Sequence, residues 1–228
     1  MVTSLFFFCI SFDPPQAKRS AALPFEACPP ALDGTLIGDV GFDPVGFSST
    51  AKGPTFADID GLTWYREAEL THGRIAQMAV VGFIWPALFG PFQSQPWAGV
   101  DSYSELFPLA AFEKVPLLAT VQILAFMFWV ETKRIGNMQS QGRNYVNGDI
   151  GLGQGAGRWN PFGFNYTPEE YAEKQLQEIK HGRLAMLGVT GLYFQAQNSG
   201  MNIVDQLGGA LSAPEYYARA GYFLPEGI

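Results

Sequence analysis

Two segments of this chain, 109 residues apart, carry nearly the same sequence, and this repeat constrains the fold more than any other feature. Residues 69–74 read Glu-Leu-Thr-His-Gly-Arg, and residues 178–183 read Glu-Ile-Lys-His-Gly-Arg. Over residues 69–82 and 178–191, seven of fourteen positions are identical. Each copy places a Glu, a His and an Arg at the start of a long apolar run, where charge is costly unless it is paired or bound to something. The repeat therefore predicts two copies of one ligand-bearing helix, packed together in a membrane.

Small residues follow each motif at every third position, a pattern that lets two helices cross closely. They are Gly73, Ala76, Ala79 and Gly82 in the first copy, and Gly182, Ala185, Gly188 and Gly191 in the second. On a helix, the Glu and the His of one copy share a face, whereas the Arg lies about 140° away from the Glu. Arg74 is therefore expected to pair with Glu178 across the crossing, and Arg183 with Glu69 in return. Each carboxylate then keeps a free lone pair, and each His a free imidazole nitrogen, on the side away from the crossing.

The hydropathy of the chain predicts three membrane-crossing helices, within residues 64–92, 115–135 and 167–196. The third begins with a strong start signal, because Thr167 precedes Pro168 and has Glu170 three positions on. Residues 202–207 form a short amphipathic stretch, typical of a surface helix. We therefore expect an all-α membrane protein with two long crossed pseudo-symmetric helices, a middle helix and a short C-terminal amphipathic helix.

Charge and composition restrict the setting of this fold. Residues 1–34 read as an N-terminal extension or a targeting remnant, and residues 35–228 as the three-helix domain. Ten of the fourteen Lys and Arg residues lie on the side of the N-terminus, whereas Lys114 and Arg219 lie on the other. This asymmetry fits three crossings. The net charge of −7 argues against nucleic-acid binding, and Cys9 and Cys28 are too few for a disulfide framework or a zinc site.

The outward-facing groups of the repeat allow several kinds of site. A di-iron site uses paired Glu-x-x-His motifs but needs two further inward carboxylates, and only Glu131 suits. A zinc hydrolase needs a His-Glu-x-x-His motif and a third ligand, which this sequence does not contain. The motifs could also serve only as interhelical ion pairs and satisfied histidines. Finally, each group could supply one axial ligand to a magnesium macrocycle, since magnesium prefers oxygen and accepts imidazole.

A second, weaker repeat precedes each long helix. Phe42-Asp43-Pro44 corresponds to Trp159-Asn160-Pro161, and each triplet is followed by a glycine two residues on. Asx-Pro followed by Gly is a turn signal. The flanking aromatic residues indicate turns that press onto something apolar.

The residues described so far resemble the light-harvesting chlorophyll-binding proteins of photosynthetic eukaryotes, over about residues 33–228. The paired Glu-x-x-His-Gly-Arg helices with a Phe-Asp-Pro-type turn before each are specific to that superfamily. His181 stands where green-plant members usually have Asn. Together with the segments at residues 62–69 and 32–44, His181 looks like a mark of a red-lineage member, of the red-algal-like or chlorophyll a/c, fucoxanthin-chlorophyll type.

The resemblance implies a set of magnesium ligands and no enzymatic activity. The implied chlorophyll ligands are Glu69, His72, Glu131, Glu178, His181 and Gln195. Two positions depart from the family pattern. The Gln usual eight residues before Glu131 is replaced by Ile123, with Gln122 one residue earlier, and the usual His of the short C-terminal helix is replaced by Gln206. Gln122 and Gln206 are the candidate ligands at these positions.

The resemblance also implies pigments, partners and location. Chlorophyll a, chlorophyll c and xanthophylls of the fucoxanthin, diadinoxanthin or alloxanthin type are expected, with carotenoid ends near the two Asx-Pro turns. The expected partners are photosystem core subunits, photosystem I above all, neighbouring antenna proteins and thylakoid lipids. The expected location is the chloroplast thylakoid membrane, with the N-terminus stromal and the C-terminus lumenal. The alternative is a photoprotective relative that dissipates energy at low lumenal pH, although the lumenal acidic residues of this sequence form no dense cluster.

Overall fold

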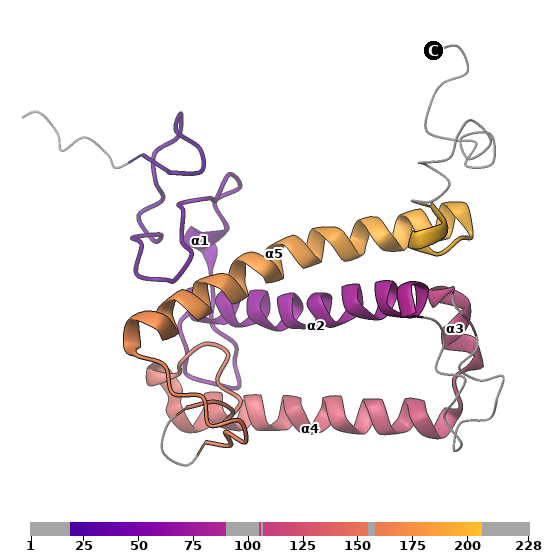
Figure 1. Ribbon diagram of the computed structural model, residues 1–228. Coiled ribbons are helices and arrows are strands. Elements are labelled where there is room, and N and C mark those ends of the chain that lie inside the picture. The colour runs from indigo at the N-terminus through magenta and orange to yellow at the C-terminus, as the bar shows by residue number, and fades with distance from the viewer. Residues whose placement is uncertain (1–18, 90–104, 106, 155–157, 207–228) are drawn as a thin grey trace, which may run out of the picture. The chain divides into compact units, whose positions relative to one another are not determined.

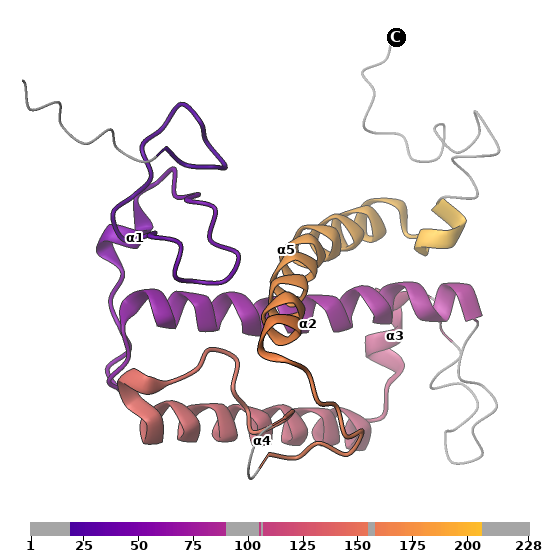
Figure 2. The ribbon, with the colours of Figure 1, turned by 60° about the vertical axis from the view of Figure 1, so that its left-hand side comes forward.

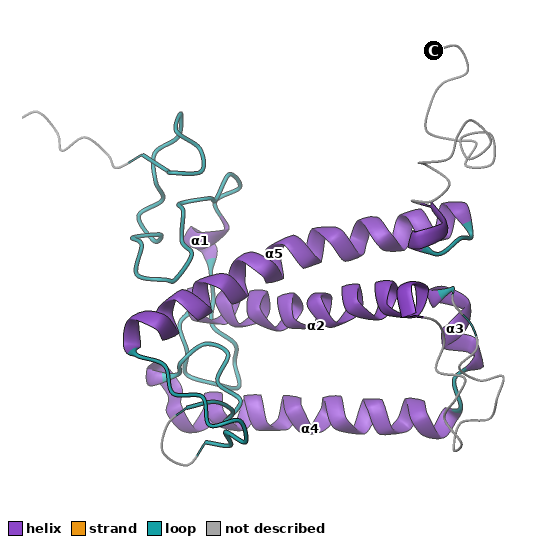
Figure 3. Ribbon diagram, in the orientation of Figure 1, coloured by secondary structure: helices purple, strands orange, loops and turns teal. Residues whose placement is uncertain are grey.

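The computed structural model describes residues 19–89, 105, 107–154 and 158–206, and its regular structure there is helical (Figures 1 and 3). The helices are α1 (Phe47–Thr50), α2 (Gly61–Phe89), α3 (Pro108–Lys114), α4 (Leu117–Gln141), the short 3-10 helix η1 (Gly142–Asn144) and α5 (Pro168–Ser199). The all-α prediction is therefore confirmed. The chain divides into two compact units, Met1–Thr50 and Ala51–Ile228.

The described part of the first unit consists of loops and α1. The Ser20 hydroxyl is buried, where it donates to the Gly41 carbonyl at 2.7 Å and accepts from the N–H groups of Ala22 and Leu23. Asp43 stands ahead of α1, and its carboxylate accepts hydrogen bonds from the N–H groups of Phe47 and Ser48. A carboxylate in this position satisfies N–H groups that the helix itself leaves unpaired.

In the second unit, the long helices α2 and α5 cross each other, as Figures 1 and 2 show. They meet at glycines: a Cβ atom added at Gly73 would lie 3.0 Å from the Cα of Gly182, and one added at Gly182 would lie 3.1 Å from the Cα of Gly73. The close crossing predicted from the small residues is thus present, with backbone against backbone.

Local capping interactions define both ends of helix α5. The Thr167 hydroxyl accepts from the N–H of Glu170, and the Glu170 carboxylate accepts from the N–H of Thr167, which is the reciprocal cap expected from the sequence. At the other end, Gly200 adopts φ 64°, a left-handed conformation that costs a glycine little. Residues 203–206 are helical, which begins the predicted short helix, and residue 207 lies outside the described part.

Helix α4 is longer than the predicted middle span, since it runs to Gln141 rather than to Ile135. Its C-terminal half is anchored: Met138 is fully buried and packs with Ile59 and Tyr145. Its N-terminal half is bare, because the side chains from Val121 to Trp129 are all exposed.

The three membrane-crossing helices predicted from hydropathy are not all identified by length and hydropathy in the described residues. There, no single helix meets both criteria for crossing a bilayer, whereas α3 taken with Leu117–Asn144 meets them as a pair bent by 107°. In α2 and α5 the polar residues of the crossing, among them Arg74 and Arg183, lie within the stretch that would have to be apolar.

Candidate functional site

Two ion pairs join α2 and α5 at their crossing. The Nε atom of Arg74 lies 2.7 Å from Oε1 of Glu178. The Nε atom of Arg183 lies 2.6 Å from Oε1 of Glu69. These are the two pairs expected from helix spacing. They compensate charge in the middle of an otherwise small-residue contact, where an unpaired charge would be costly.

The two halves of this motif differ in their surroundings. Oε2 of Glu69 also lies 3.2 Å from Nη1 of Arg66, three residues earlier on α2. The residue three before Glu178 is Gln175, so the second copy has no such arginine. Instead, Nη1 of Arg74 donates to the carbonyl of Gly148 at 3.0 Å. Glu69 is therefore held by two guanidinium groups, whereas Glu178 has one that it shares with a backbone carbonyl.

The two histidines of the repeat are oriented in the same way. Nδ1 of His72 lies 2.7 Å from the carbonyl of Ala68, and Nδ1 of His181 lies 2.8 Å from the carbonyl of Gln177. Because a carbonyl only accepts, Nδ1 carries the proton, and the lone pair is on Nε2. Both side chains are exposed. An exposed imidazole whose other nitrogen is fixed by a carbonyl is the usual form of a metal-ligating histidine.

On α4, Glu131 is held by an arginine one turn away. Nε and Nη2 of Arg134 both bind Oε2 of Glu131, at 3.0 and 2.5 Å, which leaves Oε1 as the outward oxygen. Gln122 and Ile123 are both exposed on the bare part of the helix. Gln122 therefore stays a candidate ligand, as the sequence suggests.

The two candidate glutamines near the end of α5 are in different situations. The Gln195 side chain is exposed. Gln206 is buried, and its Nε2 donates to the Ser199 hydroxyl and to the Met201 carbonyl, each at 2.8 Å. The amide nitrogen of Gln206 thus holds the chain against the end of α5, and only its carbonyl oxygen remains for a ligand.

The two Asx-Pro turns have matching internal geometry. Asp43 accepts from the N–H of Phe47, and Asn160 accepts from the N–H of Phe164, in each case four residues on. Both turns use a glycine with positive φ, at 78° for Gly46 and 65° for Gly163. The aromatic side chains beside them are exposed, namely Phe42, Phe47, Trp159, Phe162 and Phe164.

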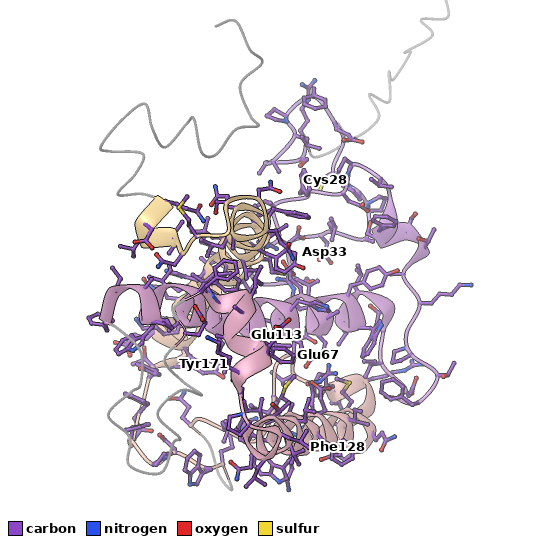
Figure 4. The ribbon with its side chains drawn as sticks, turned by 90° about the vertical axis from the view of Figure 1, so that its right-hand side faces the viewer. Cys28, Asp33, Glu67, Glu113, Phe128 and Tyr171 are labelled. Atoms are coloured by element: carbon purple, nitrogen blue, oxygen red, sulfur yellow. The ribbon has the colours of Figure 1, made fainter. Side chains whose placement is uncertain are left out.

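One acidic residue of the site, Glu67, cannot be identified by comparing the two copies of the repeat. Glu67 is fully buried and accepts a hydrogen bond from the N–H of Gly148 at 2.6 Å, and it lies on α2 (Figure 4). Its Oε1 lies 3.6 Å from Nη1 of Arg134. Burial and the negative charge of Glu67 both raise the pKa of the nearby Tyr145 phenol. The counterpart of Glu67 in the second copy is Leu176, so comparing the copies removes it from consideration.

A cavity of about 630 Å³ lies beside Glu178, between the first turns of α5 and the loop after η1. One wall is fixed by Asp149, whose carboxylate accepts two hydrogen bonds from Arg158, at 2.9 and 2.7 Å. Burial alone would raise the pKa of Asp149, but the N–H of Gly151, the amide of Gln141 and the Arg158 guanidinium together hold it below its usual value. The cavity also contains Arg74, Tyr171, Lys174 and Gln175.

The donor set fits single-ligand binding better than a metal cluster. Within residues 19–89, 105, 107–154 and 158–206, no three His, Cys, Asp or Glu side chains come together as a protein-bound metal ion requires. The candidate ligands instead stand singly on helices with large exposed apolar side chains, such as Phe126 and Phe128 on α4 and Leu184 and Leu187 on α5. Isolated oxygen or imidazole ligands on apolar surfaces suit a large planar macrocycle that already supplies most of its metal's coordination.

Comparisons with known proteins agree with this geometry. The family model described as "Chlorophyll A-B binding protein" matches residues 28–197. The chain is 31% identical to chlorophyll a-b binding protein 7, chloroplastic, of Solanum lycopersicum, over 96% of this chain and 79% of that protein. It is also 31% identical to photosystem I chlorophyll a/b-binding protein 5, chloroplastic, of Arabidopsis thaliana, over 86% and 77%. It is 36% identical to chlorophyll a-b binding protein CP24 10B, chloroplastic, of Solanum lycopersicum, over 74% and 69%. These relatives are green-lineage proteins, so the similarity reaches the family without singling out its red lineage. The chain belongs to the chlorophyll a-b binding protein family, whose members are light-harvesting antenna proteins and not enzymes.

Proposed function

We propose that this chain is a thylakoid antenna subunit that holds chlorophylls at Glu69, His72, Glu131, Glu178, His181 and Gln195, with Gln122 and Gln206 as further candidates. Chlorophyll, when bound, absorbs light and passes the excitation to neighbouring pigments. The protein contributes the ligand atoms, their orientation and an apolar surround. The observation that carries the proposal is the pair of exposed histidines, each with Nδ1 bound to a carbonyl one turn earlier and Nε2 left for a ligand.

The decisive experiment removes one ligand at a time. His72→Leu and His181→Leu proteins are refolded with chlorophyll and carotenoid, and the chlorophyll bound per polypeptide is measured after pigment extraction. Each variant should lose one chlorophyll, because a Leu has no lone pair for magnesium. Glu173→Gln is the control, since Glu173 is exposed on the same helix as His181 and bonds only to Gln177 among the described residues. A chlorophyll content equal to that of the control in both variants would contradict the proposal.

The finer identity of the antenna is part of the proposal. The photosystem served is photosystem I, which the name of one relative supports. The lineage is red, which His181 supports. Excitation spectra of photosystem I fluorescence from the purified supercomplex test the first point, because pigments of this chain should appear in them. If the pigments of this chain are absent from those spectra and transfer their excitation to photosystem II instead, the partner is photosystem II.

Pigment identity and orientation complete the proposal. Chlorophyll c and xanthophylls are proposed beside chlorophyll a, with carotenoid ends at the exposed aromatic turns around Asp43 and Asn160. Chromatography of the extracted pigments checks this directly. The N-terminus is proposed to be stromal and the C-terminus lumenal, from the basic residues. A membrane-impermeant thiol reagent added to intact thylakoids should therefore label Cys28. Labelling of Cys28 only after the thylakoids are lysed would indicate the opposite orientation.

The photoprotective alternative is separated by fluorescence lifetime. An antenna keeps its chlorophyll lifetime when the lumenal pH falls, whereas a dissipating relative shortens it. The lifetime of the reconstituted protein at neutral and acidic pH decides between them. Marked shortening at acidic pH would favour the alternative.

A further inference from the structure

Glu67 is the most completely buried charged residue among those described, and it contacts two elements besides its own helix α2. Its Oε2 accepts the N–H of Gly148, in the loop after η1, at 2.6 Å. Its Oε1 lies 3.6 Å from Nη1 of Arg134 on α4. A buried carboxylate is stable only when its partners stay in place, so these contacts fix α2, α4 and the loop together.

Each partner of Glu67 also holds a candidate pigment ligand. Arg134 reaches Glu67 through Nη1 and binds Glu131 through Nε and Nη2. On the other side, Gly148 donates its N–H to Glu67, and its carbonyl accepts from Nη1 of Arg74. Arg74 in turn binds Glu178 through Nε at 2.7 Å. A series of ion pairs and hydrogen bonds thus runs from Glu131 on α4 to Glu178 on α5, with Glu67 at its centre.

The backbone at Gly148 occupies a position in this series that suits only glycine. Its φ of 79° is a left-handed conformation that suits glycine. A Cβ atom at Gly148 would lie 2.7 Å from Nη2 of Arg74. Both the turn and the approach of the guanidinium therefore require a glycine here, and the two peptide groups that flank its Cα hold Glu67 and Arg74 respectively.

We propose that Glu67 is a positioning residue of the pigment site, which sets the orientations of Glu131 and Glu178 jointly through Arg134 and the Gly148 backbone. The inference rests on the proposed role of Glu131 and Glu178 as magnesium ligands. Glu67 touches no pigment itself in this account. Partners of metal ligands act in this way by fixing the ligand atom, and their loss usually weakens metal binding by about 10- to 100-fold.

The test replaces Glu67 by Gln, which keeps an acceptor for the Gly148 N–H but removes the charge that faces Arg134. The protein is refolded with pigments, and the absorption bands that disappear in Glu131→Leu and Glu178→Leu identify the pigments of those two sites, because a Leu has no lone pair for magnesium. In Glu67→Gln both sites should bind chlorophyll more weakly, so that half-maximal intensity of each band needs a chlorophyll concentration about 10- to 100-fold higher than in the unmodified protein. The band assigned with His72→Leu should keep its affinity. Glu173→Gln is the exposed control and should change none of them.

A second variant approaches the same series from its other end. Gly148→Ala leaves Glu67 intact but brings a methyl group onto Arg74, so it should weaken the Glu178 band and, through Glu67, the Glu131 band. A pigment-independent measurement accompanies both variants, namely hydrogen exchange of the backbone amides at residues 146–150. Glu67→Gln should accelerate it at Gly148, because the neutral amide oxygen of Gln is a weaker acceptor than a carboxylate. The double variant should weaken the two bands by less than the product of the single effects.

The outcomes separate the inference from the function on which it rests. If Glu67→Gln behaves like Glu173→Gln in both pigment bands and amide exchange, Glu67 is not a positioning residue. Parallel loss of all bands, that of His72 included, would show a general role in folding and would also overturn the inference. If Glu131→Leu and Glu178→Leu lose no pigment, the proposed ligands are wrong, and amide exchange alone then decides whether Glu67 holds Gly148.

Discussion

The glycine contact between α2 and α5 allows a quantitative prediction. Gly73→Ala would place a Cβ atom 3.0 Å from the Cα of Gly182, whereas ordinary contact begins at 3.4 Å. The neighbour is the backbone of another helix, so no side chain can rotate away and the helices must move apart by several tenths of an ångström. Overpacking of this kind costs about 1–3 kcal/mol. Alanine regains about 1 kcal/mol through its helix propensity. The net destabilisation is therefore about 0–2 kcal/mol.

Gly82→Ala is the matched control on the same helix, because a Cβ atom there meets nothing within 4 Å. It gains the propensity without the clash, so the two variants should differ by about 1–3 kcal/mol. In a protein of this size that corresponds to a difference of about 2–12 °C in Tm. The assay is thermal loss of the visible circular dichroism of the reconstituted protein, at one fixed pigment concentration. A Gly73→Ala protein as stable as Gly82→Ala would refute the close crossing.

Three further predictions follow from the ion pairs and the cap. Asp149→Asn should lower Tm through loss of about 1–3 kcal/mol of charge-assisted hydrogen bonding. In the folded protein the pKa of Asp149 lies below its usual value of 3.8. The Tm difference between the unmodified protein and Asp149→Asn should therefore be constant from neutral pH down to about pH 5 and vanish only as the pH falls through the folded pKa. A Tm difference that shrinks between pH 7 and pH 5 would contradict this assignment. Thr167→Ala should cost about 0.5–2 kcal/mol by removing the cap of α5, measured by the same melting assay, with Thr132→Ala inside α4 as the comparison. Arg74→Leu should shorten the thermal half-life of the complex more than Arg183→Leu, since Glu69 retains Arg66 when Arg183 is removed, whereas the residue three before Glu178 is Gln175; the reverse order would refute this asymmetry.

Sequence periodicity predicted those parts of the molecule that depend on local chemistry or on the repeat. The spacing of Arg74 and Arg183 predicted both ion pairs, and the residues from Thr167 to Glu170 predicted the start of α5. The end of α4 was not predicted, because hydropathy marks an apolar length and the helix continues into polar residues up to Gln141.

The functional environment of Glu67 could not be predicted for a different reason. A comparison of two copies finds what they share, and neither Glu67 nor Arg66 has a counterpart in the second copy. Their partners come from elsewhere in the chain, at Arg134 and Gly148 for Glu67, and such contacts have no local signature. The sequence offers one signal for Glu67, which is a second acidic residue two positions before Glu69 on a helix with few charged residues.

The bare length of α4 has a thermodynamic consequence. Large side chains such as Leu124 and Phe128 bury little surface, and the fully buried side chains on this helix are limited to Met138 among those described. Polypeptide contacts therefore contribute little to the free energy that holds the N-terminal half of α4 in place. When a ligand binds only the folded state, apparent stability rises with the logarithm of its free concentration. Assembly of this protein and its loading with pigment are then one linked equilibrium, and its melting temperature is as much a measure of pigment supply as of sequence.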